Sequence, residues 1–276
     1  MNPPATPGSR IETFAGGLAL SLVDHGAGRP VLVLHGGGGP ASVARFVQAL
    51  SATRRVLAPT HPGFAGTPRP ASFDSVTQLA ACYVELLDRL ELEDVLVIGF
   101  SMGGWIASEL ATRADARLRA DARLRGVVLV DATGIEVEGE ACVDVFPLKP
   151  NELSALSMHD PAKYGIDPAT LTPEQKAAMA ANFQALAAYC KARGTCDPTL
   201  RARLAAVTAP ALVVWGASDR IVTPAYGQAY ARSFADARFE LIAECGHLPQ
   251  VEQPARLMAL VHEFDAATAP TSSTSA

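Results

Sequence analysis

The sequence lacks any apolar run long enough to cross a membrane, and its start lacks the pattern of a secretion signal. Polar residues interrupt the chain before an unbroken stretch of about 20 apolar residues can form. The first ten residues, from Met1 to Arg10, contain no apolar core of signal-peptide length. With 49% hydrophobic and 18% charged residues, the 276-residue chain is expected to be globular and to have no membrane partner.

The net charge is small, and the sequence contains few cysteines. The formal net charge is −5 and basic residues cluster only around residues 115–125, so nucleic acid is not an expected partner. Five cysteines are scattered without C-x-x-C spacing, which favours a reducing, cytoplasmic location. Cys190 and Cys196 are close enough in sequence to pair, but this compartment favours two free thiols.

Motifs for nucleotide and metal binding are absent as well. The glycine-rich segment from His35 to Pro40 has no following G-K-[ST], and the chain has no G-x-G-x-x-G with a ribose-binding acid downstream. No group of histidine, cysteine and acidic residues has the spacing of a metal site. We therefore expect neither a cofactor nor a bound metal.

What the sequence does contain is a regular alternation of strand and helix signals. Short apolar runs predict eight strands, at residues 11–14, 18–23, 31–34, 55–58, 95–98, 127–130, 211–215 and 239–242. Helical patterns follow at residues 43–50, from about Asp74 to Leu90, at residues 105–112, and after Thr223 and Pro254. Repeated strand–helix units with doubly apolar strands predict an α/β fold with a mostly parallel eight-stranded sheet, flanked by helices.

The alternation stops between residues 134 and 207, where helix signals replace strand signals. Thr172-Pro-Glu-Gln175 is a capping box that opens a long helix. A helical insertion after the sixth strand predicts a cap over the carboxyl edge of the sheet, where such sheets bind ligands. We therefore expect a core of residues 11–133 and 208–265, a cap of residues 134–207, and disordered ends at 1–10 and 266–276.

The strand at residues 95–98 runs into a serine flanked by glycines. Gly99-Phe-Ser101-Met-Gly103 matches G-x-S-x-G and lies between a predicted strand and a predicted helix. Such a turn exposes the serine hydroxyl at the carboxyl end of the sheet, next to the free N–H groups of a helix start. We interpret Ser101 as a nucleophile, with a purely structural Gly-Ser turn as the alternative.

A serine nucleophile needs a base and a group that orients the base. His247 follows the strand at 239–242, and Asp219 follows the strand at 211–215, so both would reach the same edge of the sheet. Asp131, at the end of the strand at 127–130, is the rival acid. His61 also follows a strand, but Pro62 favours a role in a turn.

The remaining site residues would hold the oxyanion and the substrate. Glycines in the His35–Pro40 segment let the backbone approach a ligand, so the N–H groups of Gly37, Gly38 and Met102 are candidates for an oxyanion hole. Apolar side chains of the predicted cap and loops are candidates for the substrate pocket: Phe100, Phe146, Met158, Phe183 and Leu248.

These segments together resemble the α/β-hydrolase superfamily, in its capped branch, over residues 11–265. The resemblance is carried by five segments: His35-Gly-Gly-Gly38, Pro59-Thr-His-Pro-Gly-Phe-Ala-Gly-Thr67, Gly99-Phe-Ser-Met-Gly-Gly104, Trp215-Gly-Ala-Ser-Asp219 and Gly246-His247. The first and third are similar to meta-cleavage-product hydrolases, which break C–C bonds in dienone acids. This chain departs from them near Arg45-Phe46, where they have asparagine, and at Leu248, where they have tryptophan. The segment Gly99-Phe-Ser-Met-Gly-Gly104 is also similar to the corresponding segment of cofactor-free perhydrolases and haloperoxidase-like esterases.

The residues and the resemblance together predict a serine hydrolase that cleaves a small carboxylic ester or lactone. One alternative is a C–C hydrolase of the meta-cleavage-product type. Another is a receptor for a small ligand that keeps the catalytic residues with little turnover, since a fold and a site do not guarantee a reaction. The expected partner is a small carbonyl compound, and the oligomeric state stays open.

Overall fold

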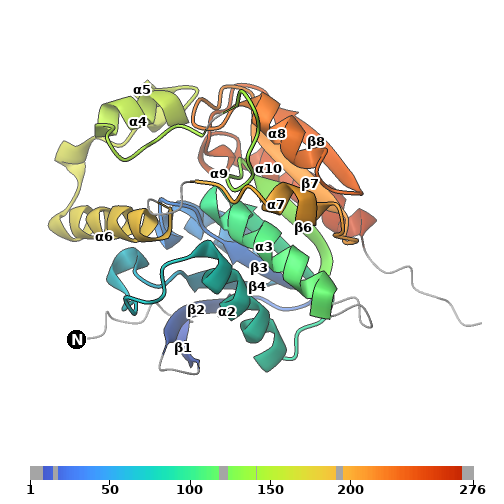
Figure 1. Ribbon diagram of the computed structural model, residues 1–276. Helices are drawn as coiled ribbons and strands as arrows, with labels where there is room; N and C mark the ends of the chain where they lie inside the picture. The colour runs from blue at the N-terminus through green and yellow to red at the C-terminus, as the bar shows by residue number, and fades with distance from the viewer. Residues whose placement is uncertain (1–8, 15–17, 118–123, 141, 191–194, 269–276) are drawn as a thin grey trace, which may run out of the picture.

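The fold is built on one eight-stranded sheet, seen here in a computed structural model that describes residues 9–14, 18–117, 124–140, 142–190 and 195–268 (Figure 1). In chain order the strands are β1 (Ser9–Thr13), β2 (Ala19–His25), β3 (Pro30–Leu34), β4 (Arg55–Thr60), β5 (Val95–Phe100), β6 (Leu124–Val130), β7 (Ala211–Gly216) and β8 (Ala237–Ile242). Their order across the sheet is β1-β2-β4-β3-β5-β6-β7-β8. β1 and β2 form an antiparallel hairpin, and every pair from β4 to β8 is parallel. The predicted, mostly parallel sheet is therefore confirmed.

The predicted boundaries at the two ends of the chain differ from the structure. β1 begins at Ser9, so the last two residues of the predicted disordered start pair with β2. The final helix, α10 (Pro254–Ala267), likewise extends two residues into the predicted tail. Residues 1–8 and 269–276 lie outside the described residues.

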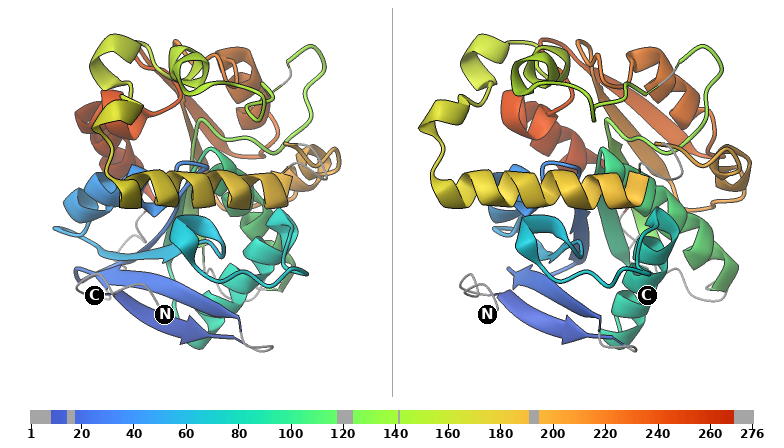
Figure 2. Two further views of the ribbon diagram at one scale, coloured as in Figure 1. Left: turned by 90° about the vertical axis from the view of Figure 1, so that its left-hand side faces the viewer. Right: turned by 60° about the vertical axis from the view of Figure 1, so that its left-hand side comes forward.

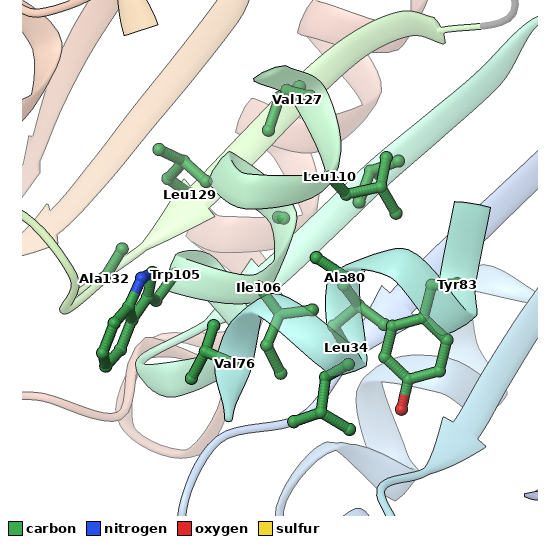
Figure 3. Close-up of a cluster of buried hydrophobic side chains, with 14 of the residues drawn as sticks. Leu34, Val76, Ala80, Tyr83, Trp105, Ile106, Leu110, Val127, Leu129 and Ala132 are labelled. Carbon is green, nitrogen blue, oxygen red and sulfur yellow. The ribbon is translucent and has the colours of Figure 1, made fainter. Parts of the chain in front are cut away.

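Helices cover both faces of the sheet, which explains why all six residues of β5 are buried. One core cluster joins the sheet to α2 (Val76–Arg89), α3 (Met102–Arg117) and α8 (Pro224–Ala231), through side chains such as Leu79, Ile106 and Tyr230. Figure 3 shows part of this cluster, with Ile106 and Leu110 of α3 among side chains of α2, β3 and β6. A second cluster packs the other face against α1 (Ala44–Leu50) and α10.

The start of α2 differs by one residue from the expected cap. Ser75, rather than Asp74, is the N-cap, and its side chain accepts a hydrogen bond from the Gln78 N–H. The Gln78 side chain reaches back to the Ser75 N–H at 3.1 Å, which completes a capping box. This reciprocal pair of hydrogen bonds satisfies the backbone N–H groups of both Ser75 and Gln78, which explains why Ser75 is the N-cap.

Between β6 and β7 the described residues contain helices and one isolated bridge, from Gly134 to Cys196, but no strand. The helices are α4 (Pro150–Ser157), α5 (Pro161–Tyr164), η4 (Pro168–Thr170), α6 (Pro173–Cys190) and α7 (Leu200–Leu204). The predicted capping box at Thr172 and Gln175 is present, with bonds of 2.9 and 3.2 Å. Figure 2 shows α6 extended across the molecule, with α4 and α5 on one side of it. That residues 134–207, the cap segment hereafter, act as a separate cap stays a prediction.

None of the described helices is long and apolar enough to span a bilayer. All five cysteines are free thiols, including Cys190 and Cys196.

Two buried histidines lie at the ends of β3 and β4, where the loops toward the site begin. The ring centroids of His35 and His61 are 3.8 Å apart. His35 Nε2 accepts the His61 N–H at 3.1 Å, so its proton is on Nδ1, which bonds the Gly36 carbonyl at 2.8 Å. His61 Nε2 bonds the His35 carbonyl at 2.9 Å, and its Nδ1 bonds the Tyr83 hydroxyl. Each ring therefore uses one nitrogen as donor and one as acceptor, which is the neutral form.

These two histidines predict an acid-sensitive fold. Burial lowers the pKa of His35 to about 4 and, together with the neighbouring His35, lowers the pKa of His61 well below its usual value. Below about pH 6.5 the unfolded chain binds protons that the folded chain does not, so stability falls as the pH falls toward 4. His35 should cost about 2 kcal/mol of unfolding free energy between about pH 7 and pH 5, and His61 should add to the loss in the same direction.

Thermal melts at both pH values check this. His35→Gln should be less stable than the wild type at neutral pH, because its hydrogen bonds are lost, but its melting temperature should fall less on acidification. His262→Gln, on α10, is the control and should keep the wild-type pH dependence. Equal pH dependence in all three proteins would contradict the prediction.

Candidate functional site

Three loops at the carboxyl ends of β5, β7 and β8 bring together the predicted serine, aspartate and histidine. Ser101 lies between β5 and α3, Asp219 lies between β7 and α8, and His247 follows β8. His247 Nε2 is 2.9 Å from Ser101 Oγ, and His247 Nδ1 is 2.8 Å from Asp219 Oδ2. The three side chains therefore form one continuous hydrogen-bonded chain.

The turn at Ser101 is strained, and the flanking glycines make it possible. Ser101 has φ of 52°, a left-handed conformation that is costly for a residue with a side chain. A Cβ at Gly103 would overlap the Leu34 carbonyl oxygen, and a Cβ at Gly99 would overlap the Gly103 carbonyl oxygen. The G-x-S-x-G pattern is thus explained by backbone crossings too close for any side chain.

Asp219 is held so that it orients the histidine. Its Oδ1 accepts the N–H groups of Ile221 at 2.8 Å and Val222 at 3.2 Å, which leaves Oδ2 for the imidazole. An Nδ1–H that donates to this carboxylate leaves Nε2 unprotonated and facing Ser101 Oγ. The arrangement can therefore remove a proton from the serine hydroxyl.

Asp131, the rival acid, occupies a different position. It is fully buried at the end of β6, with φ of 45°, and its Oδ1 accepts the Gly216 N–H at 2.9 Å. Its Oδ2 has no partner among the described residues. The carboxylate that bonds the imidazole is that of Asp219.

The loop after β3 lies directly against the nucleophile. A Cβ on Gly36 would lie 2.9 Å from the Ser101 Cβ. Met102 is the first residue of α3, so its N–H has no acceptor within the helix. In the described part of the chain, the N–H groups of Gly37, Gly38 and Met102 donate to no backbone acceptor. These three predicted donors are free to hold a developing oxyanion.

The candidate pocket residues are only partly brought together. The rings of Phe146 and Phe183 meet edge to face, 5.5 Å apart, and Phe183 is 41% exposed. Met158 is buried at the end of α4, where a Cβ on Gly246 would touch its backbone. Leu248 is partly buried beside His247. Phe100 instead packs in the second core cluster, with its ring 5.2 Å from that of Phe46.

The sequence reasoning missed Asn182, a buried residue of α6 that links two glycine-containing loops. Its Nδ2 donates to the Gly38 carbonyl at 2.9 Å, and its Oδ1 accepts the Ala65 N–H at 2.7 Å. One turn further along α6, Leu186 fills the space where a Cβ on Gly37 would lie. The cap segment therefore holds the loop that carries two oxyanion-hole candidates. Asparagine is unfavourable inside a helix, and that was the one available signal.

Glu252 is a second residue that the sequence did not indicate. Its carboxylate accepts the N–H groups of Gly246 at 2.6 Å, His159 at 3.0 Å and Asp160 at 3.1 Å. The His247 N–H also donates to the Ser157 carbonyl at 2.6 Å. The end of α4 is thereby fixed to the loop that carries His247.

Side-chain atoms of Asp131, Asp219 and His247 lie within 4.8 Å of one another, close enough to be compared with a metal site. The Asp219 and His247 atoms are already bonded to each other, and the other His247 nitrogen faces Ser101. This donor set fits proton transfer better than metal ligation.

Comparison with known proteins shows the family to which the chain belongs. Residues 31–260 match the model of the alpha/beta hydrolase family. A 2-hydroxymuconate semialdehyde hydrolase of Pseudomonas sp. (strain CF600) is 29% identical over 286 residues, covering 96% of each chain.

Two solved structures match this chain with a TM-score of 0.73 each. Each match covers 94% of this chain and 98% of the solved chain. They are a meta-cleavage product hydrolase from Pseudomonas fluorescens IP01, at 22% identity, and a thermophilic esterase from Thermogutta terrifontis, at 25% identity. The family match covers most of the sheet and all three loops that meet at Ser101, and the chain is therefore a hydrolase that belongs to the alpha/beta hydrolase family.

Proposed function

We propose that this chain is a serine hydrolase that cleaves a small carboxylic ester or lactone by acyl transfer. The observation that carries the proposal is the Ser101–His247–Asp219 chain, with bonds of 2.9 and 2.8 Å, beside a loop with free N–H groups. A nucleophile, an oriented base and oxyanion donors are the groups that acyl transfer requires.

In the proposed mechanism, His247 Nε2 takes the Ser101 proton as Oγ attacks the substrate carbonyl. Asp219 keeps the imidazole in the required tautomer and stabilises the imidazolium. The N–H groups of Met102 and Gly37, with Gly38 beside them, stabilise the oxyanion, at about 3–4 kcal/mol for a well-placed donor. His247 then gives the proton to the leaving oxygen and activates the water that hydrolyses the acyl-enzyme.

C–C hydrolysis is the second candidate, because a relative matched over 96% of its length is named 2-hydroxymuconate semialdehyde hydrolase. The same nucleophile and base would serve such a reaction. The departure at Leu248 favours the ester or lactone, since the meta-cleavage-product hydrolases that the chain resembles have tryptophan there. A small-ligand receptor would show one stoichiometric burst without turnover.

A turnover screen and a single variant test the proposed function. Short-chain p-nitrophenyl esters and lactones should be turned over faster than 2-hydroxymuconate semialdehyde under the same conditions. Ser101→Ala should lower kcat at least ~10³-fold and abolish labelling by a fluorophosphonate probe, because the attacking oxygen is gone. Labelling that survives in the folded variant would overturn the assignment, and preference for the dienone acid would favour C–C hydrolysis.

Asn182 should affect the rate rather than substrate binding. Asn182→Leu leaves the Gly38 carbonyl and the Ala65 N–H unpaired and frees the oxyanion loop. We expect kcat to fall about tenfold, in line with the loss of one or two hydrogen bonds, with little change in KM. Gln184→Leu, exposed on the same helix, is the control. An equal kcat in both variants would exclude a positioning role for Asn182.

The cap segment should help to select the substrate. Phe183→Ala removes a half-exposed ring that packs on Phe146, so kcat/KM should drop more for longer acyl chains than for acetyl esters. Lys176→Ala, exposed nearer the start of α6, should leave the chain-length profile as in the wild type. A Phe183 variant with lower stability but an unchanged profile would assign the ring to packing alone.

A further inference from the structure

Two buried carboxyl groups lie next to each other at the site. Asp131 and Asp219 follow the neighbouring parallel strands β6 and β7. They are 0% and 3% exposed, and one oxygen of each lies within 4.8 Å of the other and of a His247 ring nitrogen. Two carboxylates in one buried site repel each other strongly, so one of them is expected to keep its proton.

The hydrogen bonds indicate which one. Asp219 accepts three N–H donors, from Ile221, Val222 and the His247 ring, and all of them favour the ionised form. Asp131 accepts one, from Gly216, and its buried Oδ2 has no partner among the described residues. A proton on this oxygen would convert an unpartnered acceptor into a donor, and the neighbouring Asp219 carboxylate is an acceptor for it.

The other titratable groups near Asp131 do not supply a compensating positive charge. Glu252, on α9 (Pro249–Glu252), accepts backbone N–H groups and is itself acidic. The buried Cys245 thiol adds no positive charge. Burial first, and then the charge of Asp219, raises the pKa of Asp131 well above its usual range.

We propose that Asp131 is a positioning residue that stays protonated and donates its Oδ2 hydrogen to the Asp219 carboxylate. The bond holds Asp219 toward His247 and limits the buried pair to a single negative charge. A second charge would hold the imidazolium more tightly and hinder the return of its proton to the leaving group. The kinetic consequence rests on the proposed serine mechanism, whereas the position of the proton does not.

Infrared spectroscopy tests the proton directly and without substrate. At neutral pH the wild type should show the C=O stretching band of a protonated carboxylic acid. The band should be lost in Asp131→Asn and retained in Asp236→Asn, which removes an exposed carboxylate. A spectrum without a band that depends on Asp131 would overturn the proposal, whatever the enzyme hydrolyses.

The pH profile tests the consequence for catalysis. Asp131→Asn keeps an acceptor for Gly216, places an N–H donor toward Asp219, and suits φ of 45°. The acid limb of its kcat/KM profile should coincide with that of the wild type. If Asp131 were ionised, the substitution would remove a negative charge and shift this limb to lower pH by about one unit or more. Such a shift would overturn the proposal.

Asp131→Leu and Asp219→Asn complete the set. The leucine variant has no donor for Asp219, so kcat should fall about 10- to 100-fold, far more than in Asp131→Asn. Asp219→Asn should lose at least ~100-fold in kcat, since the imidazole would favour the wrong tautomer. A folded Asp131→Leu variant that is as active as Asp131→Asn would overturn the positioning role. If Asp131→Leu does not fold, the pH profile of Asp131→Asn and the infrared band still test the proposal.

Discussion

The backbone of the serine turn touches the backbone at the end of β3, and the other parts of the site are placed by this contact. Gly103 passes so close to the Leu34 carbonyl that a Cβ would overlap it, and Gly36 lies against Ser101. The contact sets the nucleophile beside the N–H groups of the following glycines. It also fixes the first turn of α3, where Met102 has no backbone acceptor while the Gly104 and Trp105 N–H groups donate to the Ser101 carbonyl. A side chain at Gly103 or Gly36 would force Ser101 and the loop after β3 apart.

The cap segment is joined to this centre at two places, one on each of two loops beside Ser101. Asn182 bonds the loop with the predicted oxyanion donors, while Glu252 and the Ser157 carbonyl hold the loop that carries His247. A movement of the cap segment would therefore change the oxyanion loop and the histidine loop together. The cap segment is thus mechanically coupled to both loops that lie beside Ser101.

Much of the fold, and the nucleophile, base and acid of the candidate site, could be predicted because local patterns define them. Doubly apolar strands, a glycine-flanked serine and the capping box at Thr172 each result from constraints within a few residues. Asn182, Glu252 and the state of Asp131 depend on backbone atoms that are distant in sequence, so no local pattern marks them. Phe100, a predicted pocket residue, lies at the end of a strand whose side chains alternate between the two faces of the sheet, and its ring packs against Phe46 instead.

Two of the anchors between the cap segment and the core use main-chain atoms of one partner. Glu252 bonds the N–H groups of His159 and Asp160, and Asn182 bonds the peptide groups of Gly38 and Ala65. These bonds do not depend on the side chains of residues 157–160 or of the glycine loop, so substitutions there leave them in place, although replacing His159 would remove its separate bond to Ser218 Oγ at 2.8 Å. The two anchors therefore constrain the positions of the loops around Ser101 without constraining which side chains those residues carry.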